Sequence, residues 1–437
     1  MSFRFTRRNF LQTSAAAASL AAINVSAPAF AADAQPSKKL NVAVIGPCGQ
    51  GSYSLGNVLG ENVVALVDID SKRLDEAGGR APAAQKFQDF RKMYEQVKDL
   101  DAVCVCTPDH THAVASLMGM RMGINCYCEK PLAHNVNECR VMQQVAAEKN
   151  LVTQMGTQIH AGDNYRRVVE LVQSGAIGTV KDVHVWCGKG WGQPADFKNP
   201  TDTPACPANI DWDSWIGPAK MRPYHPCYLP ANWRKWWAFG NGTIGDMACH
   251  VMDLAFWALE LKDCLSAEPV EGPAVNDEGC PLNLTVKYQF PSRGDKPACT
   301  LTWYDGEKRP AILKEKNIPD RFMGVLFIGD KGMLFADYGG YALYPENQYK
   351  DFKKPEPWIA KSLGHHAEWL QAIRDGKPEA CTCKFAYSGR LSETVLLGAV
   401  AYRCQQKLEW DADAMKVKNC DLANQLVKQE LRQGWTL

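Results

Sequence analysis

The chain has 437 residues, of which 46% are hydrophobic, a composition ordinary for a globular protein with a sizeable core. This length predicts two or three domains of about 150 residues each. The formal net charge of +1 argues against a nucleic-acid or anionic-membrane partner.

An export signal is predicted at residues 1–31. Arg7 and Arg8 precede an alanine-rich apolar run that ends in a small-residue cleavage site at residues 29–31. The arginine pair is typical of the twin-arginine pathway, which moves folded proteins, so we expect a periplasmic or secreted protein. The run is too short and too rich in small residues to span a membrane, so the mature chain is expected to have no membrane span; an uncleaved anchor is the alternative.

The 17 cysteines would normally pair in an oxidising compartment. Many of them stand in strand-like runs, such as residues 103–106 and 126–128, where cysteines two apart share one face. No Cys-x-x-Cys pair is present to indicate zinc or redox chemistry. We therefore expect buried free thiols rather than a disulfide framework, and no metal site.

Residues 38–158 are predicted to form a domain with a parallel sheet. Apolar runs alternate here with helical patterns, which is typical of successive βαβ units. The runs span residues 40–45, 63–67, 102–106, 125–128 and 151–154, and the helical patterns include 89–97, 112–121 and 137–149.

A glycine-rich turn follows the first run. Gly46, Cys48 and Gly51 occupy the three positions of the G-x-G-x-x-G pattern, and Gly49 lies beside the middle one. Such a turn sets backbone N–H groups and a helix N-terminus against a pyrophosphate, so the sequence predicts a bound dinucleotide. Cys48 replaces the glycine that allows the closest approach, and a tight structural turn is the alternative.

An acidic residue indicates which dinucleotide is bound. Asp68 lies 22 residues after Gly46, at the end of the second run, where a carboxylate bonds both ribose hydroxyls and repels a 2′-phosphate. NAD is therefore favoured over NADP. Lys72 and Arg73 follow closely and can compensate for the negative charge, and a strand-end cap is the other interpretation of Asp68.

Two further runs end in polar residues. Thr107, Pro108 and His112 follow the third run, and Glu129 and Lys130 follow the fourth. The carboxyl ends of parallel strands meet at the edge where open α/β sheets bind ligands, so these residues are expected at the cofactor. His112 is expected to pack beside the nicotinamide rather than to catalyse.

Residues 159–437 have a different character. Several strand-like runs follow one another here, which predicts an open, mainly antiparallel sheet in a second α/β domain. These runs span 181–188, 282–289, 298–304, 323–329 and 332–337, with helical patterns at 164–174, 244–259, 364–375 and 388–404. A long insertion rich in Pro, Gly and Trp occupies about 189–241.

Together these motifs resemble the glucose–fructose oxidoreductase/inositol dehydrogenase/MocA (Gfo/Idh/MocA) family over nearly all of the mature chain, and Glu129-Lys130-Pro131 is the most specific mark. The resemblance implies a Rossmann NAD(P) domain, a second α/β domain that presents its open sheet to the substrate, and a homo-oligomer, dimer or tetramer. It assigns the catalytic lysine to Lys130 and a catalytic acid and histidine to Asp246 and His250. The subgroup resembles the secreted, twin-arginine-exported members.

The chemistry of these residues agrees with that assignment. Oxidation of a sugar hydroxyl needs a base, and His250 with Asp246 at i and i+4 shares one helix face. Lys130 can bond the reacting hydroxyl and stabilise negative charge. A pair that simply bonds nearby backbone is the alternative.

The substrate contacts are expected after the fifth run and in the insertion. Gln158 is expected beside the cofactor and His160 beside the substrate. Seven tryptophans lie between residues 186 and 237, and from this stretch Tyr224, Arg234 and Trp237 are candidates for sugar binding. The alternative is that the tryptophans mainly anchor a long insertion.

We therefore expect an NAD-dependent oxidoreductase acting on a sugar or glycoside hydroxyl. Because no free NAD pool exists outside the cytoplasm, NAD is expected to stay tightly bound. The alternative is a redox-neutral NAD-dependent glycosidase that oxidises, eliminates, hydrates and re-reduces one sugar. A non-catalytic sugar-binding protein is a third hypothesis.

Overall fold

Six strands of the N-terminal part form one parallel sheet, in the order β3-β2-β1-β4-β5-β6. The computed structural model describes residues 38–437, so the predicted export signal lies outside the described residues. A helix follows each strand on the way to the next: β1 (Asn41–Ile45), α2 (Gly51–Val58), β2 (Asn62–Val67), α3 (Ser71–Gly78), β3 (Gln85–Phe87), α4 (Phe90–Gln96), β4 (Ala102–Val105), α5 (Asp109–Arg121), β5 (Asn125–Cys128), α6 (Val136–Glu148) and β6 (Thr153–Met155). This is the strand order of a doubly wound dinucleotide-binding fold, and it confirms the predicted Rossmann architecture.

Local sequence explains these elements. The last four residues of β1, Val-Ala-Val-Ile, are buried, as expected for a parallel strand whose two faces are both covered. Asp70 caps α3 by accepting from the backbone N–H groups of residues 72 and 73. Asn135 and Glu138 form a reciprocal capping box at the start of α6. The strand order reverses at β1, which is the point where such sheets bind ligands.

Nine strands of the C-terminal part form a second sheet, in the order β13-β12-β11-β7-β10-β9-β8-β14-β15. The elements are η1 (Gln158–Ala161), α7 (Asp163–Gln173), β7 (Val180–Cys187), α8 (Trp212–Ile216), η2 (Pro226–Tyr228), η3 (Asn232–Lys235), η4 (Ile244–Ala248), α9 (Cys249–Leu259), β8 (Ser266–Glu271), β9 (Thr285–Phe290), β10 (Cys299–Asp305), α10 (Ile312–Glu315), β11 (Met323–Gly329), β12 (Met333–Ala336), β13 (Tyr341–Tyr344), η5 (Glu346–Tyr349), α11 (His365–Asp375), η6 (Pro378–Ala380), α12 (Phe385–Cys404), β14 (Leu408–Asp411), β15 (Lys416–Val417) and α13 (Asp421–Val427). β7 and β10 run parallel and the other neighbours antiparallel, which confirms the predicted mainly antiparallel sheet.

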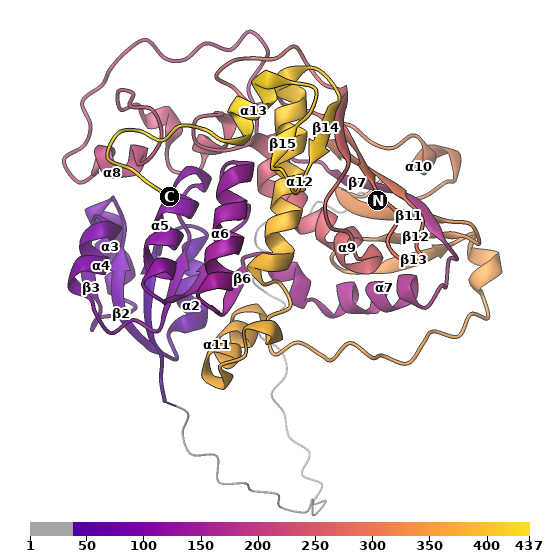
Figure 1. Cartoon of the computed structure of the whole chain (residues 1–437), viewed down its shortest axis with the longest axis horizontal. Helices are drawn as coiled ribbons and strands as arrows, with labels where there is room; N and C mark the ends of the chain where they lie inside the picture. The colour runs from indigo at the N-terminus through magenta and orange to yellow at the C-terminus, as the bar shows by residue number, and fades with distance from the viewer. Residues whose placement is uncertain (1–37) are drawn as a thin grey trace, which may run out of the picture. The chain divides into compact units, whose positions relative to one another are not determined.

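Helix α12 joins the two sheets (Figure 1). It packs against β8 of the second sheet and against α6 of the first part. Arg140 of α6 donates to both carboxylate oxygens of Glu393 at 2.9 and 2.8 Å, and Gln143 adds a bond of 2.6 Å. Residues 39–437 thus pack as one compact unit.

The helix predicted over residues 244–259 begins differently from the prediction. Residues Ile244–Ala248 form a π-helical turn, and a regular α-helix, α9, starts only at Cys249. A π turn widens the backbone and is common at functional sites. Here the backbone carbonyl of Asp246 accepts a hydrogen bond from Lys130 Nζ at 2.9 Å. The spacing of Asp246 and His250 is therefore not that of a plain α-helix.

Two further observations concern the described part of the chain. No helix in residues 38–437 combines the length and the apolar character needed to cross a membrane. All 17 cysteines are free thiols, and most of them are buried.

Candidate active site

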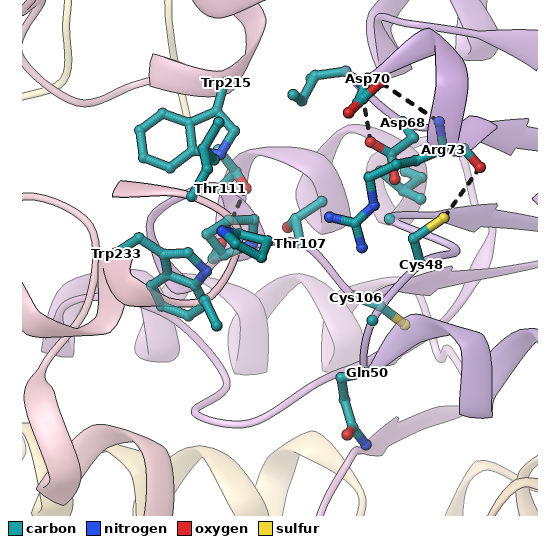
Figure 2. A pocket seen from close by; sticks show the side chains of 18 of the residues that line it. Cys48, Gln50, Asp68, Asp70, Arg73, Cys106, Thr107, Thr111, Trp215 and Trp233 are labelled. Atoms are coloured by element: carbon teal, nitrogen blue, oxygen red, sulfur yellow. Dashed lines mark hydrogen bonds between the residues drawn. The ribbon is translucent and has the colours of Figure 1, made fainter. Parts of the chain in front are cut away.

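A cavity of about 590 Å³ lies at the carboxyl ends of β1, β2, β4 and β5. In Figure 2, Trp215 and Trp233 of the insertion stand on one side of it, and Asp68, Arg73 and Cys48 stand on the other. Most of the predicted site residues line it: Gly46, Cys48, Gly49, Asp68, Thr107, Pro108, His112, Glu129, Lys130, Tyr224 and Arg234.

The glycine turn has the geometry that a pyrophosphate requires. Gly46 has a φ of +78°, and a Cβ there would lie 2.7 Å from the carbonyl oxygen of Cys106. A Cβ on Gly51, at the start of α2, would lie 1.8 Å from the Gly46 oxygen. The Cys48 thiol lies 3.2 Å from the backbone carbonyl oxygen of Arg73 (Figure 2). The turn, the helix N-terminus and the cavity therefore fit a dinucleotide, and Cys48 is accommodated.

Asp68 lies at the end of β2, where the adenine ribose of a dinucleotide is expected. Its Oδ1 accepts from the backbone N–H of Asp70 at 3.1 Å. Burial raises the pKa of its carboxyl group from 3.8. Arg73 also lines the cavity and brings a positive charge to the same region.

Asp246 is surrounded by three cations. Its Oδ1 accepts from Lys130 Nζ at 2.8 Å and from Arg234 Nε at 3.0 Å, and its Oδ2 accepts from Lys189 Nζ at 3.2 Å. Burial alone would raise the pKa of Asp246, but Lys130 and the other two cations hold it well below 3.8. Asp246 is therefore an ionised anchor for Lys130 rather than a proton acceptor.

His250 is not among the residues that line the cavity, and one of its ring nitrogens lacks a partner in the described residues. Its Nδ1 is buried and has no hydrogen-bond partner in the described residues. Burial, and next the charge of Lys130, lower the pKa of His250 to about 3, so the imidazole is neutral at physiological pH. Within residues 38–437 no hydrogen bond joins Asp246 to His250, because the Asp246 carboxylate oxygens bond the cations.

Two buried acids lie close to Lys130 and Arg234. Burial raises the pKa of both Glu129 and Asp109 to about 7. Glu129 Oε1 accepts from Gln158 Nε2 at 2.8 Å, so Gln158 acts through Glu129 and does not itself line the cavity. Asp109 was not predicted as a site residue, although it stands inside the Thr107–His112 motif that marked this strand end.

His112 is held in place by backbone. Its Nδ1 lies 2.8 Å from the carbonyl oxygen of Pro131 and its Nε2 lies 2.8 Å from that of Thr107. Burial lowers the pKa of His112 to about 4. The neutral ring has one N–H, so it donates to one of these two carbonyls while its other nitrogen faces the second, and His112 forms part of the cavity wall.

The structure places two predicted substrate residues away from the cavity. His160 is buried in another network, where its Nδ1 lies 2.9 Å from Asp253 and its ring stacks on Trp257 at 4.0 Å. Trp237 packs in the core and donates its Nε1–H to the Asn276 carbonyl at 3.0 Å. Both side chains therefore pack in the protein core and do not line the cavity.

The cavity also has residues that the sequence did not single out. They include Gln50, Gln88, Phe90, Thr111, Ser214, Leu229 and Pro230. Trp215 and Trp233 belonged to the tryptophan-rich stretch, which was the signal available for them. Among residues 38–437, no group of three His, Cys, Asp or Glu side chains is placed to hold a metal ion.

Comparison with known proteins gives the same architecture. Residues 40–157 match the family model "Oxidoreductase family, NAD-binding Rossmann fold", and residues 161–437 match "Oxidoreductase family, C-terminal alpha/beta domain". Inositol 2-dehydrogenase 3 of Saccharopolyspora erythraea is 33% identical over 128 residues, 29% of this chain and 37% of that protein. Levoglucosan dehydrogenase of Pseudarthrobacter phenanthrenivorans is 27% identical over 196 residues, 44% of this chain and 40% of that protein.

The chain spans less than half the length of these curated relatives. Among solved structures, the WlbA dehydrogenase from Bordetella pertussis, in complex with NADH and UDP-GlcNAcA, matches with a TM-score of 0.63 at 15% identity. That match covers 86% of this chain and 99% of the other, and at this identity it shows the fold alone. Because the family models match both parts of the described structure, the chain belongs to the Gfo/Idh/MocA oxidoreductase family and carries its NAD-binding Rossmann domain.

Proposed function

We propose that this protein oxidises a hydroxyl group of a sugar or glycoside, with His250 as acid/base and Lys130 assisting. The proposal rests on one observation: the catalytic lysine expected from the sequence lines the cavity and is fixed there by Asp246, beside an unpartnered neutral histidine. The sugar and polyol dehydrogenases among the relatives support a carbohydrate substrate.

NAD bound in the cavity would supply the acceptor for a hydride from the sugar carbon. Lys130 uses two ammonium hydrogens on the backbone and side-chain oxygens of Asp246, which leaves one to donate to the reacting hydroxyl. That donor stabilises negative charge as it develops on the oxygen. Neutral His250 accepts the hydroxyl proton, and Asp246 holds the lysine in position.

NAD rather than NADP is the cofactor we infer. The Asp68 carboxylate lines the cavity at the end of β2, where it would accept from ribose hydroxyls and repel a 2′-phosphate. Arg73 weakens the preference for NAD over NADP, because its positive charge lies in the same part of the cavity and would attract a 2′-phosphate.

We also infer that the cofactor stays bound through turnover. The insertion is joined to the loop after Asp68 by several bonds: Asn209 Nδ2 donates to Asp70 at 2.7 Å, and Asp211 N–H donates to the Ile69 carbonyl at 2.9 Å. Because this loop carries the predicted ribose-binding site, release of a dinucleotide would require these contacts to open. The hydride would then be returned to a second sugar or to another acceptor.

We propose that residues 1–31 direct twin-arginine export to the periplasm or beyond, and that the mature protein forms a homo-oligomer. Changing Arg7 and Arg8 to Lys should keep the protein in the cytoplasmic fraction. Light scattering of the purified protein should give a dimer or tetramer mass, and a monomer would contradict the second proposal.

The decisive experiment uses protein purified without added nucleotide. Denaturation should release NAD, and sugars or glycosides should produce a lasting reduced-nicotinamide band in the near ultraviolet. Lys130→Met and His250→Asn should retain nucleotide and lose the band, whereas Lys149→Met, an exposed lysine after α6, should behave as wild type. Aglycone release without a lasting band would instead support the redox-neutral glycosidase. Absence of nucleotide, of the band and of aglycone release would overturn the proposal.

A further inference from the structure

The cluster around Asp246 holds more positive than negative charge. Lys130, Lys189 and Arg234 all bond one carboxylate, and both of its oxygens are used. Anchoring a single catalytic lysine requires one carboxylate and no further cation. The other two cations therefore need a separate explanation.

Arg234 is the best placed of the three to bind a ligand. It lines the cavity, its Nε bonds Asp246, and its Nη1 reaches the Ala231 carbonyl at 3.3 Å. Its Nη2 has no hydrogen-bond partner among residues 38–437. The guanidinium also packs on Trp233 at 4.2 Å and Trp191 at 5.7 Å. The outer edge of the guanidinium is therefore held in one orientation with donors to spare.

Lys189 lies near the same aromatic ring as Arg234. Its ammonium lies 5.9 Å from the Trp191 ring, and its side chain is 40% exposed. The acids nearby, Asp109 and Glu129, do not fully cancel this charge, because burial raises the pKa of each to about 7. A neutral sugar gains nothing from such an excess of positive charge.

We propose that the sugar substrate carries a carboxylate, as a uronic acid does, and that Arg234 binds this group with Lys189 beside it. The planar edge of a guanidinium matches a carboxylate with two parallel hydrogen bonds. This inference rests on the proposed function in taking a sugar as the ligand. It adds the class of sugar.

The test compares two glycosides with the same aglycone, a glucuronide and a glucoside, by titration of the nucleotide-containing protein in a calorimeter. Charge-assisted hydrogen bonds predict that the wild type binds the glucuronide about ten- to a hundredfold more tightly. Arg234→Gln should reduce this ratio to near one, and Lys189→Met should reduce it partly while the Lys130–Asp246 pair is kept. Lys235→Met removes the same charge one residue further along and should leave the ratio unchanged.

Equal binding of the two glycosides by the wild type, or an unchanged ratio in Arg234→Gln, would overturn the inference. Tighter binding of a sulfated glucoside than of the glucuronide would overturn the assignment of a carboxylate. Because calorimetry reports binding and the near-ultraviolet band reports hydride transfer, Arg234-dependent binding with no nicotinamide reduction would support this inference and contradict the proposed function. Oxidation of both glycosides by a protein that binds them equally would support the proposed function and contradict this inference.

Discussion

Neutralising Asp246 should destabilise the folded protein. Asp246→Asn keeps the shape of the side chain, but it leaves Lys130, which is 8% exposed, without a counter-ion. Removal of one partner from a buried ion pair costs about 3–5 kcal/mol. Lys189 and Arg234 are 40% and 19% exposed, so solvent screening reduces what they add. With an unfolding entropy of about 2 cal/mol/K per residue over roughly 400 residues, the unfolding midpoint should fall by about 4–6 °C.

The effect of this substitution should depend on pH. The folded-state pKa of Asp246 lies well below 3.8, so its ionisation stabilises the folded protein above about pH 4. That stabilisation is lost as the pH falls through the folded-state pKa. Thermal melts followed by circular dichroism should therefore show a constant gap between wild type and variant from about pH 6 to pH 8, and a narrower gap below about pH 4.

A matched control is available on the surface. Asp75 pairs with Lys86, and the two side chains are 72% and 43% exposed. The same change there, Asp75→Asn, should alter the free energy of unfolding by less than about 1 kcal/mol. If Asp246→Asn melts within error of this control, the idea that a buried carboxylate organises the cation cluster is wrong.

Three further substitutions test other parts of the site. Gly51→Ala should abolish co-purification of nucleotide and lower the melting midpoint, because the added Cβ would lie 1.8 Å from the Gly46 carbonyl oxygen. Gly60→Ala is the control: a Cβ there meets no atom within 4 Å, so neither property should change. Asp68→Asn should lower the preference for NAD over NADP in equilibrium binding by about tenfold, since it removes the charge that repels a 2′-phosphate. Asp109→Asn should reduce the loss of stability seen in melts at pH 8 relative to pH 5. Burial raises the pKa of Asp109 from 3.8 to about 7, so the wild type loses stability as the pH rises through this interval.

The sequence predicted the buried strands well and the exposed ones poorly. β5 has the predicted bounds, because a parallel strand buried on both faces is a continuous apolar run. β3, with exposed Gln85 and Lys86, was not predicted, and neither was the two-residue strand β15. Pairing with a neighbour, rather than side-chain pattern, defines strands of this kind.

In the candidate site, too, some residues were predictable from the sequence and others were not. Residues at strand ends, such as Asp68 and Lys130, were predictable because the sheet fixes where a strand ends. The grouping of Lys189 and Arg234 on Asp246 was not, since it joins segments that are distant along the chain. Trp233 and Trp237 are four residues apart, yet only the first lines the cavity, and composition alone does not separate them.

The insertion links the two halves of the proposed chemistry. It supplies Trp215 and Trp233 to one wall of the cavity, and it supplies Arg234 to the charge cluster beside Lys130. The C-terminal segment secures it, since Arg432 donates to the Asp213 carboxylate at 2.6 Å and to the Pro218 carbonyl at 2.9 Å. One segment would therefore both enclose the cofactor and present the proposed substrate-binding group. An enzyme that keeps its cofactor has no need to open this segment for nucleotide exchange, so the segment can hold its substrate-binding group rigidly.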